Sequence, residues 1–522
     1  MLELEKRNIH RNRLKSQTGT QVTLDDDFIV PDTMDDISEV ILDSGIIQLE
    51  PVKVQRERIT VRGKLEFHVL YRTEEGGLQT LGGAIPFEEG INVPELEEKD
   101  YVSVGWQLDD LDTEMIHSRK LGVRAIVTLE VKAESLYDTE AAVDVRDSGA
   151  ADGEIHLQVK KKQIPTAAIA LRRKDTYRLK EDVTLPGSKP AIERMLWTEM
   201  SLAGCLAKPL DGQIHLEGTL MVFVLYEGGG DGQVQWVEEN IPFSGEVKMQ
   251  GAEAEMIPAI GMKLVHREIE EKPDPDGELR ELSVDAVIEL DVRLYEEQEL
   301  ELLQDLYATN REIVPETADA VFDRILTRNF GKCKVAEKVN LETDPRVLQI
   351  CHSGGSVKLD GVESREEILA LDGVLEVKLL YLTDDDARPV QAVTRLVPFH
   401  YEAEVPGIRE DSSWYLEPGL EQLTAVMAGG GQAELRGVIA FDLLVLQPEP
   451  GQVIRQVQVL PADTEKMKAM PGIVGYFVQP QDSLWDVAKH FHTTEDSILA
   501  SNELPGGEIK AGDCLILVKE IG

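Results

Sequence analysis

Few residues in this chain have the types and spacing that chemistry requires. The ten histidines form no HExxH pair, and Cys205, Cys333, Cys351 and Cys514 show no metal-ligand spacing. No GxSxG elbow, GxGxxG fingerprint or P-loop occurs. The run Asp384–Asp386 suggests a cation site, but only by its carboxylates. We predict no catalytic residue, no metal and no cofactor, and therefore a protein that is not an enzyme.

Residues 476–491, YFVQPQDSLWDVAKHF, are better suited to binding than to catalysis. Ser483 is placed to cap a helix over residues 484–491, whose apolar positions i, i+3, i+4 and i+7 form one buried stripe. Trp485 lies off that stripe. Its ring is therefore either an exposed anchor for a partner, as aromatic residues often are, or is packed on its own loop.

The elements that position this stretch form a short C-terminal domain. A strand at 476–478, helices at 484–491 and 494–501, and a strand at 514–518 are expected in that order. A domain this small has a marginal core, so most of its apolar positions must be structural. The pattern predicts a small α+β unit over residues 474–522.

The remainder of the chain is repetitive. GKLEFHVLY begins at Gly63, GTLMVFVLY at Gly218 and GVLEVKLLY at Gly373, two intervals of 155 residues. Each is followed by a turn-rich stretch and then by IPF or VPF. We predict three tandem copies, over residues 1–155, 156–310 and 311–465. The turns that match Asp384–Asp386 hold other residues, so a solvated turn explains this run better than a cation site.

Each copy is predicted to be mainly β, as a sandwich or barrel. Short runs rich in β-branched and aromatic residues, bounded by Gly, Pro and Asp, are typical of strands. The small residue that opens each run predicts a bulge or a close backbone approach. One short helix per copy is expected around residues 34–41, 190–196 and 345–351.

Composition excludes several classes of partner. The chain has 54 basic and 97 acidic residues, a net charge of -43 that repels phosphate backbones and anionic lipid. We therefore expect no nucleic acid partner and no membrane insertion. The N-terminus shows no apolar signal region, and four cysteines in 522 residues suit a reducing compartment, so we expect a cytoplasmic location.

The C-terminal pattern resembles a LysM domain. The residues that fall where that family places them are Asp482, Ser483, Leu484, Ala488, Phe491, Asn502, Ile509, Gly512, Asp513 and Leu515. Two loops of LysM domains line a groove for N-acetylglucosamine-containing glycans. The resemblance therefore implies partner- or glycan-binding residues at Gln481, Asp482, Ser483, Leu484, Trp485, Asn502, Glu503, Leu504 and Pro505. The family usually has glycine where this chain has Gln481, and a side chain there would crowd a glycan.

The copies resemble the SPOCS domain of sporulation proteins. The second copy carries the likeness best, with LPGSKPAIERML at 185–196, EGTLMVFVLY at 217–226 and IPF at 241–243. Three such domains before a LysM domain is similar to clostridial spore coat morphogenetic proteins. The resemblance implies a mother-cell adaptor at the forespore surface. It would bind the basement-layer ATPase, stage IV sporulation protein A, through the LysM domain, and could contact other coat proteins. The alternative is a binder of peptidoglycan or cortex glycan through the LysM groove.

Overall fold

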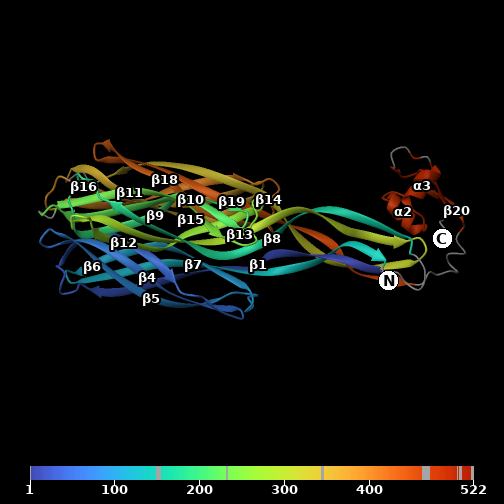
Figure 1. Ribbon diagram of the computed structural model, residues 1–522, viewed down its shortest axis with the longest axis horizontal. Coiled ribbons are helices and arrows are strands. Elements are labelled where there is room, and N and C mark those ends of the chain that lie inside the picture. The colour runs from blue at the N-terminus through green and yellow to red at the C-terminus, as the bar shows by residue number, and fades with distance from the viewer. Residues whose placement is uncertain are drawn as a thin grey trace.

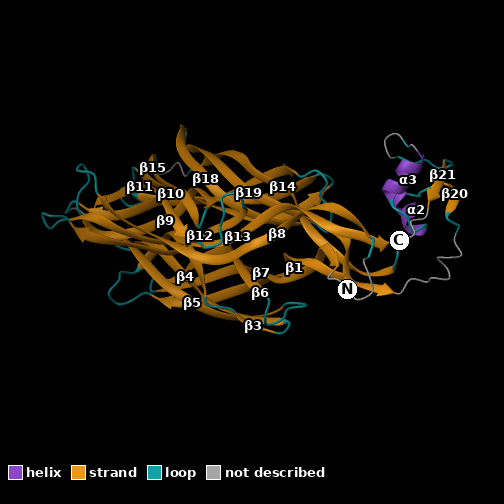
Figure 2. Ribbon diagram, turned by 45° about the vertical axis from the view of Figure 1, so that its right-hand side comes forward, coloured by secondary structure: helices purple, strands orange, loops and turns teal. Residues whose placement is uncertain are grey.

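The computed structural model describes residues 2–147, 155–230, 233–341, 346–460, 471–502, 504 and 508–518. Antiparallel strands make up almost all of it, and two short helices lie near the C-terminus (Figure 2). The predicted fold class, mainly β with a small C-terminal α+β unit, is confirmed.

Three groups of strands follow one another along the chain. Repeat 1 contains β1 (Leu2–Ile29), β2 (Ile37–Leu49), β3 (Lys53–Gln55), β4 (Arg58–Thr73), β5 (Leu78–Asn92), β6 (Tyr101–His117) and β7 (Lys120–Asp147). Repeat 2 contains β8 (Leu157–Thr184), β9 (Ile192–Leu210), β10 (Gln213–Gly228), β11 (Gln233–Lys248), β12 (Ile257–Pro273) and β13 (Leu279–Ala308). Repeat 3 contains β14 (Glu312–Asn340), β15 (Val347–Arg365), β16 (Ile368–Thr383), β17 (Val390–Glu404), β18 (Ser413–Gly429) and β19 (Gln432–Leu460).

Each repeat is a sandwich of two antiparallel sheets. In repeat 1 the sheets have the orders β1-β7-β6 and β2-β4-β5, with the short β3 also paired to β4, and repeats 2 and 3 reproduce both three-stranded orders. Alternate residues of the central strands, such as Val123, Ala125 and Val127 of β7, are buried between the sheets. The period of two in burial is the one that a strand with one core-facing side requires.

The glycine that opens each repeated run makes the predicted close approach. A Cβ on Gly373 would lie 2.3 Å from the backbone oxygen of Lys358 and 2.8 Å from the ring of Phe399. Gly63 and Gly218 are equally crowded, by Phe87 and Phe243. These rings come from the IPF and VPF segments. The two segments that recur in every copy, the glycine-led run and IPF or VPF, therefore pack on each other.

The helices expected near the start of each copy are wrong. Residues 37–41, 192–196 and 347–351 lie in β2, β9 and β15. The pairing of each of these strands with its neighbour contains register shifts, for example between Ile37 and Glu39 and between Val40 and Leu42. Each bulge places an extra residue on one strand, so apolar residues recur at helix-like spacing in a segment that is extended.

The three repeats surround a common axis. Leu70, Leu225 and Leu380, spaced by 155 residues, belong to one buried cluster. Equivalent positions meet at one point only if the repeats are related by an approximate threefold rotation. Repeat 3 closes back on repeat 1, because the Lys378 ammonium donates to the Asp43 backbone oxygen at 2.6 Å and to its carboxylate at 3.1 Å.

One buried histidine lies in the contact between repeats 2 and 3. The His352 ring stacks on Phe223 with 4.0 Å between ring centroids, and its nitrogens lie 3.4 Å from Glu199 and 3.6 Å from Glu238. Burial disfavours the imidazolium, but the two carboxylates outweigh it and raise the pKa of His352 to about 9. An ion cluster therefore joins these repeats.

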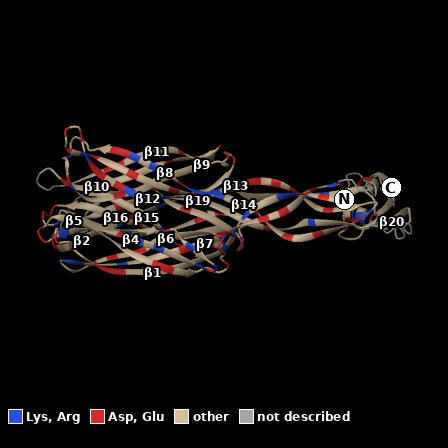
Figure 3. Cartoon of the chain, turned by 60° about the horizontal axis from the view of Figure 1, so that its bottom comes forward, with Lys and Arg blue, Asp and Glu red and all other residues tan. Residues whose placement is uncertain are grey.

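The longest strands extend beyond the sandwiches as a narrow stalk, seen on the right of Figure 1. The stalk comprises the first halves of β1, β8 and β14 and the last halves of β7, β13 and β19. Its interior is apolar, and Ile9, Leu302 and Phe322, one from each repeat, share a cluster there. Acidic and basic side chains both occur along these strands (Figure 3), and pairs such as Lys6 with Glu140 bridge them.

A buried polar network joins all three repeats near the base of the stalk. The Glu134 carboxylate accepts hydrogen bonds from Asn12 at 2.8 Å, from the Tyr415 hydroxyl at 3.0 Å and from Arg172. Arg293 lies 3.6 Å from the same carboxylate. Glu134 belongs to repeat 1, the two arginines to repeat 2 and Tyr415 to repeat 3. Repeat 1 thus depends on repeats 2 and 3 to satisfy the buried Glu134 charge.

Candidate interaction site at the C-terminal domain

The C-terminal domain lies at the far end of the stalk from the sandwiches (Figure 1). Strands β20 (Ile473–Phe477) and β21 (Cys514–Val518) pair antiparallel, and α2 (Leu484–His490) and α3 (Glu495–Asn502) cover one face of the pair. Its core includes Val487, Ala488, Ile498, Leu515 and Leu517. The predicted order of strand, helix, helix, strand is therefore present.

Two predicted binding residues are held by bonds within the domain. Asp482 accepts a hydrogen bond from the Tyr476 hydroxyl at 2.6 Å and from the backbone N–H of Gln479 at 2.8 Å. These bonds, that of Tyr476 foremost, hold the pKa of Asp482 below its usual range. Ser483 caps α2 as predicted, in a reciprocal capping box with Asp486. Both side chains fix the turn before α2.

Asn502 joins the end of α3 to β21. Its amide nitrogen donates to the backbone oxygens of Ile498 and Ile516, each at 2.8 Å, and its amide oxygen accepts from the Ile516 N–H at 2.6 Å. Leu484 and Leu504 pack partly buried against the domain core. The remaining predicted residues of this loop, Glu503 and Pro505, lie outside the described residues.

Gln481 occupies a backbone conformation that favours glycine. Its φ is 80°, in the left-handed region, and its side chain is exposed. This accounts for the glycine that the resemblance leads one to expect here. The side chain therefore projects from a strained turn beside the predicted groove.

The prediction that Trp485 is an exposed anchor is wrong. Its side chain is only 5% exposed, and its ring meets Tyr307 of β13 edge to face, with centroids 4.8 Å apart. Its indole N–H donates to the Asp305 carboxylate at 2.8 Å, and Lys489 donates to both oxygens of the same carboxylate at 2.8 Å. The Tyr307 hydroxyl donates to the Thr493 backbone oxygen at 2.8 Å. Trp485 is therefore buried against repeat 2 rather than on its own loop.

The opposite face of the domain is exposed and apolar. In the hairpin, Ile473 is opposite Val518, Gly475 is opposite Ile516 and Phe477 is opposite Cys514, so all six lie on the outer side of the two strands. Ile473 is 68% exposed, Phe477 63% and Ile516 50%. We call these six residues the hairpin face. It points away from the stalk, since α2 lies on the stalk side in both views (Figures 1 and 2).

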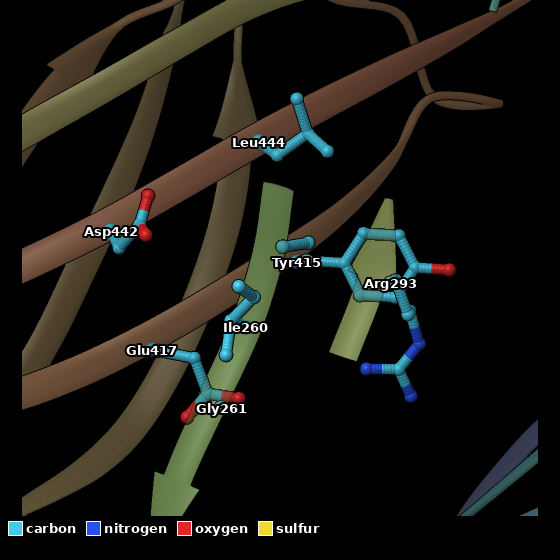
Figure 4. A pocket seen from close by; sticks show the side chains of 8 residues that line it. Ile260, Gly261, Arg293, Tyr415, Glu417, Asp442 and Leu444 are labelled. Atoms are coloured by element: carbon cyan, nitrogen blue, oxygen red, sulfur yellow. The ribbon is translucent and has the colours of Figure 1, made fainter. Parts of the chain in front are cut away.

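A small hollow, open to solvent, lies between repeats 2 and 3. Its lining includes Arg293, Tyr415, Glu417 and Asp442 (Figure 4). The Arg293 guanidinium lies 4.9 Å from the Tyr415 ring centroid, and both residues also contact Glu134. The pocket is thus part of the contact between repeats. Among the described residues, no group of three or more His, Cys, Asp or Glu is placed to hold a metal.

Comparison with known families decides what these units are. A family model described as the SPOCS domain of SipL matches residues 36–116, 191–270 and 346–428, and the LysM domain model matches residues 476–517. The chain is a SPOCS-repeat protein with a C-terminal LysM domain. Curated proteins and solved structures gave no match.

The two families are binding domains, so the chain combines a sporulation-associated repeat with a peptidoglycan-binding type of module. Each SPOCS match spans the strands from the start of β2, β9 or β15 into β6, β12 or β18. The long outer strands that build the stalk lie largely outside the matches. Within the described part of the chain, no helix is long and apolar enough to cross a membrane.

Sequence reasoning missed two parts of this site. Asp305 and Tyr307 give no local sign of their role, because the partners of their hydrogen bonds follow 180 and 186 residues later in the sequence. The hairpin face did carry a signal, since both faces of Ile473–Phe477 and Cys514–Val518 are apolar and a domain with one core can bury only one.

Proposed function

We propose that this SPOCS-repeat protein is a non-enzymatic adaptor in spore coat morphogenesis. It acts in the mother-cell cytoplasm at the forespore surface. There its LysM domain binds the basement-layer ATPase, stage IV sporulation protein A. The single observation that supports this most is the hairpin face, an exposed apolar surface at the extreme end of an elongated body.

An exposed apolar surface of this kind favours a protein partner. Monomeric soluble proteins rarely leave contiguous apolar side chains in water unless another surface covers them. Phe477 is the largest side chain of the hairpin face, and residues 476–519 hold seven acidic residues against three lysines. The partner surface expected to fit is apolar with a basic rim. An anionic glycan polymer offers neither feature.

The test is capture of purified stage IV sporulation protein A by the full-length chain. Phe477→Ser should weaken capture by roughly thirtyfold, since truncating an interface hot spot costs about 2 kcal/mol or more. The matched control is Phe330→Ser in β14, because Phe330 is 53% exposed and lies far from the LysM domain in the sequence. Equal capture by wild type and Phe477→Ser would show that the hairpin face does not bind this ATPase.

The second candidate is binding of peptidoglycan or cortex glycan through the loops around Gln481 and Asn502. The LysM match favours it. Several side chains there already serve the fold, which leaves the exposed Gln481 as the group most available to a sugar. Sedimentation with purified peptidoglycan separates the two candidates. Robust co-sedimentation together with no capture of a coat protein would favour the glycan.

A further inference from the structure

The LysM domain and repeat 2 meet in a contact with defined chemistry. Asp305 has every carboxylate oxygen occupied, by the Leu306 N–H, the Trp485 indole N–H and the Lys489 ammonium, all at 2.8 Å. Tyr307 is 4% exposed and shares a buried cluster with the LysM core. Both domains therefore contribute a charged and an aromatic side chain to one small interface.

Asp305 and Tyr307 lie on the side of β13 that faces the LysM domain. The pairing of β13 with β8 shifts register between Leu303 and Asp305, leaving Gln304 as the extra residue. Beyond this bulge, Leu306 and Ala308 belong to a buried apolar cluster of the stalk. Because side chains alternate along a strand, Asp305 and Tyr307 point to the opposite side, where they contact Trp485.

The bulge is common to the three repeats. In repeat 1 the corresponding shift leaves Val143 unpaired, and in repeat 3 it leaves Arg455 unpaired. Both lie as far along their strands as Gln304 does in repeat 2, counted from the equivalent residues Ala125, Ala286 and Gly437. Tyr307 is what distinguishes repeat 2, because the matching residues in repeats 1 and 3 are Arg146 and Gln458.

We propose that Asp305 and Tyr307 form a dock that holds the LysM domain on repeat 2 in one orientation. The dock closes the α2 face around Trp485 to external ligands and leaves the hairpin face outward. This goes beyond the proposed function and does not depend on which partner binds. Residues 461–472 connect the two bodies, and short connections give effective concentrations in the millimolar range. A contact with an intrinsic dissociation constant well below 1 mM is therefore mostly closed.

The test is amide hydrogen exchange on the full-length chain without any partner. Asp305→Lys places a second ammonium beside Lys489 and removes the acceptor of Trp485. We expect exchange of α2 and of the end of β13 to rise at least tenfold, which corresponds to ~1.4 kcal/mol. The double variant Asp305→Lys with Lys489→Asp re-forms an ion pair of opposite sense. It should recover part of the lost protection.

The matched control is Glu301→Lys, which reverses an exposed charge on the same strand that pairs with Lys161 and not with the LysM domain. This variant should leave the amide exchange of α2 unchanged. The amides of Leu515 and Leu517 report on the LysM fold itself and should stay protected in every variant. The dock is refuted if Asp305→Lys leaves α2 exchange unchanged, if Glu301→Lys acts equally, or if the hairpin amides lose protection too. That last result would make Asp305 a determinant of the LysM fold rather than of its placement.

Discussion

Replacing Glu134 by glutamine tests whether the three repeats are one cooperative body. Glu134 is buried and its carboxylate meets Arg172 and Arg293 of repeat 2 and Tyr415 of repeat 3. Glutamine keeps the shape but removes the charge, which leaves the buried Arg172 guanidinium without its counterion, whereas Arg293 keeps Asp291 at 3.1 Å. Breaking a buried ion pair from one side costs about 3–5 kcal/mol.

The same carboxylate predicts a dependence on pH. Burial works to raise the pKa of Glu134, but Arg172 and Arg293 outweigh it and hold the pKa below its usual range. A lowered folded-state pKa contributes stability above the unfolded value, near pH 4.3, and that stability is lost as pH falls through the folded pKa. The difference in unfolding free energy between wild type and Glu134→Gln should therefore be largest at pH 7 and should decrease as the pH falls.

Guanidinium chloride unfolding at pH 7, followed in both proteins by the same probe, measures the effect. The control is Glu140→Gln in the same strand, because Glu140 pairs with Lys6 in solvent and should change the unfolding free energy by less than about 0.5 kcal/mol. A Glu134→Gln protein within 0.5 kcal/mol of wild type at pH 7 would show that the network does not hold the repeats together.

Two further predictions concern stability. The raised pKa of about 9 means that His352 adds to the unfolding free energy in full below pH 6.5, and that this stabilisation is lost as pH rises through 9. His352→Leu should therefore remove part of the pH dependence of the melting temperature. Melting curves at pH 6 and pH 9.5 test it, and an unchanged difference between the two would contradict the ion cluster with Glu199 and Glu238. Gly373→Ala should cost about 1–3 kcal/mol in chemical unfolding, since the added methyl meets backbone at 2.3 Å. Gly419→Ala, where nothing lies within 4 Å, should cost far less, and equal costs would refute the steric reason.

Local patterns in the sequence determined the parts of this protein that depend on neighbouring residues. The period of 155 predicted three like units, the β-branched runs predicted strands, and the small residue that opens each run predicted a bulge or a close approach such as that at Gly373. The helix cap at Ser483 and the order of the LysM elements followed from spacing alone. These features arise from alternation, capping and backbone sterics, which act over a few residues.

Only the tertiary structure decided how these units combine. The expected helices were wrong because bulges in β2 and its equivalents imitate helical spacing, and a bulge becomes visible only when the partner strand is known. The burial of Trp485 depends on Asp305, which precedes it by 180 residues in the sequence. The burial of Glu134 also depends on distant segments, because its partners come from all three repeats. Contacts between distant segments depend on register and packing, and no short window of sequence contains both sides of them.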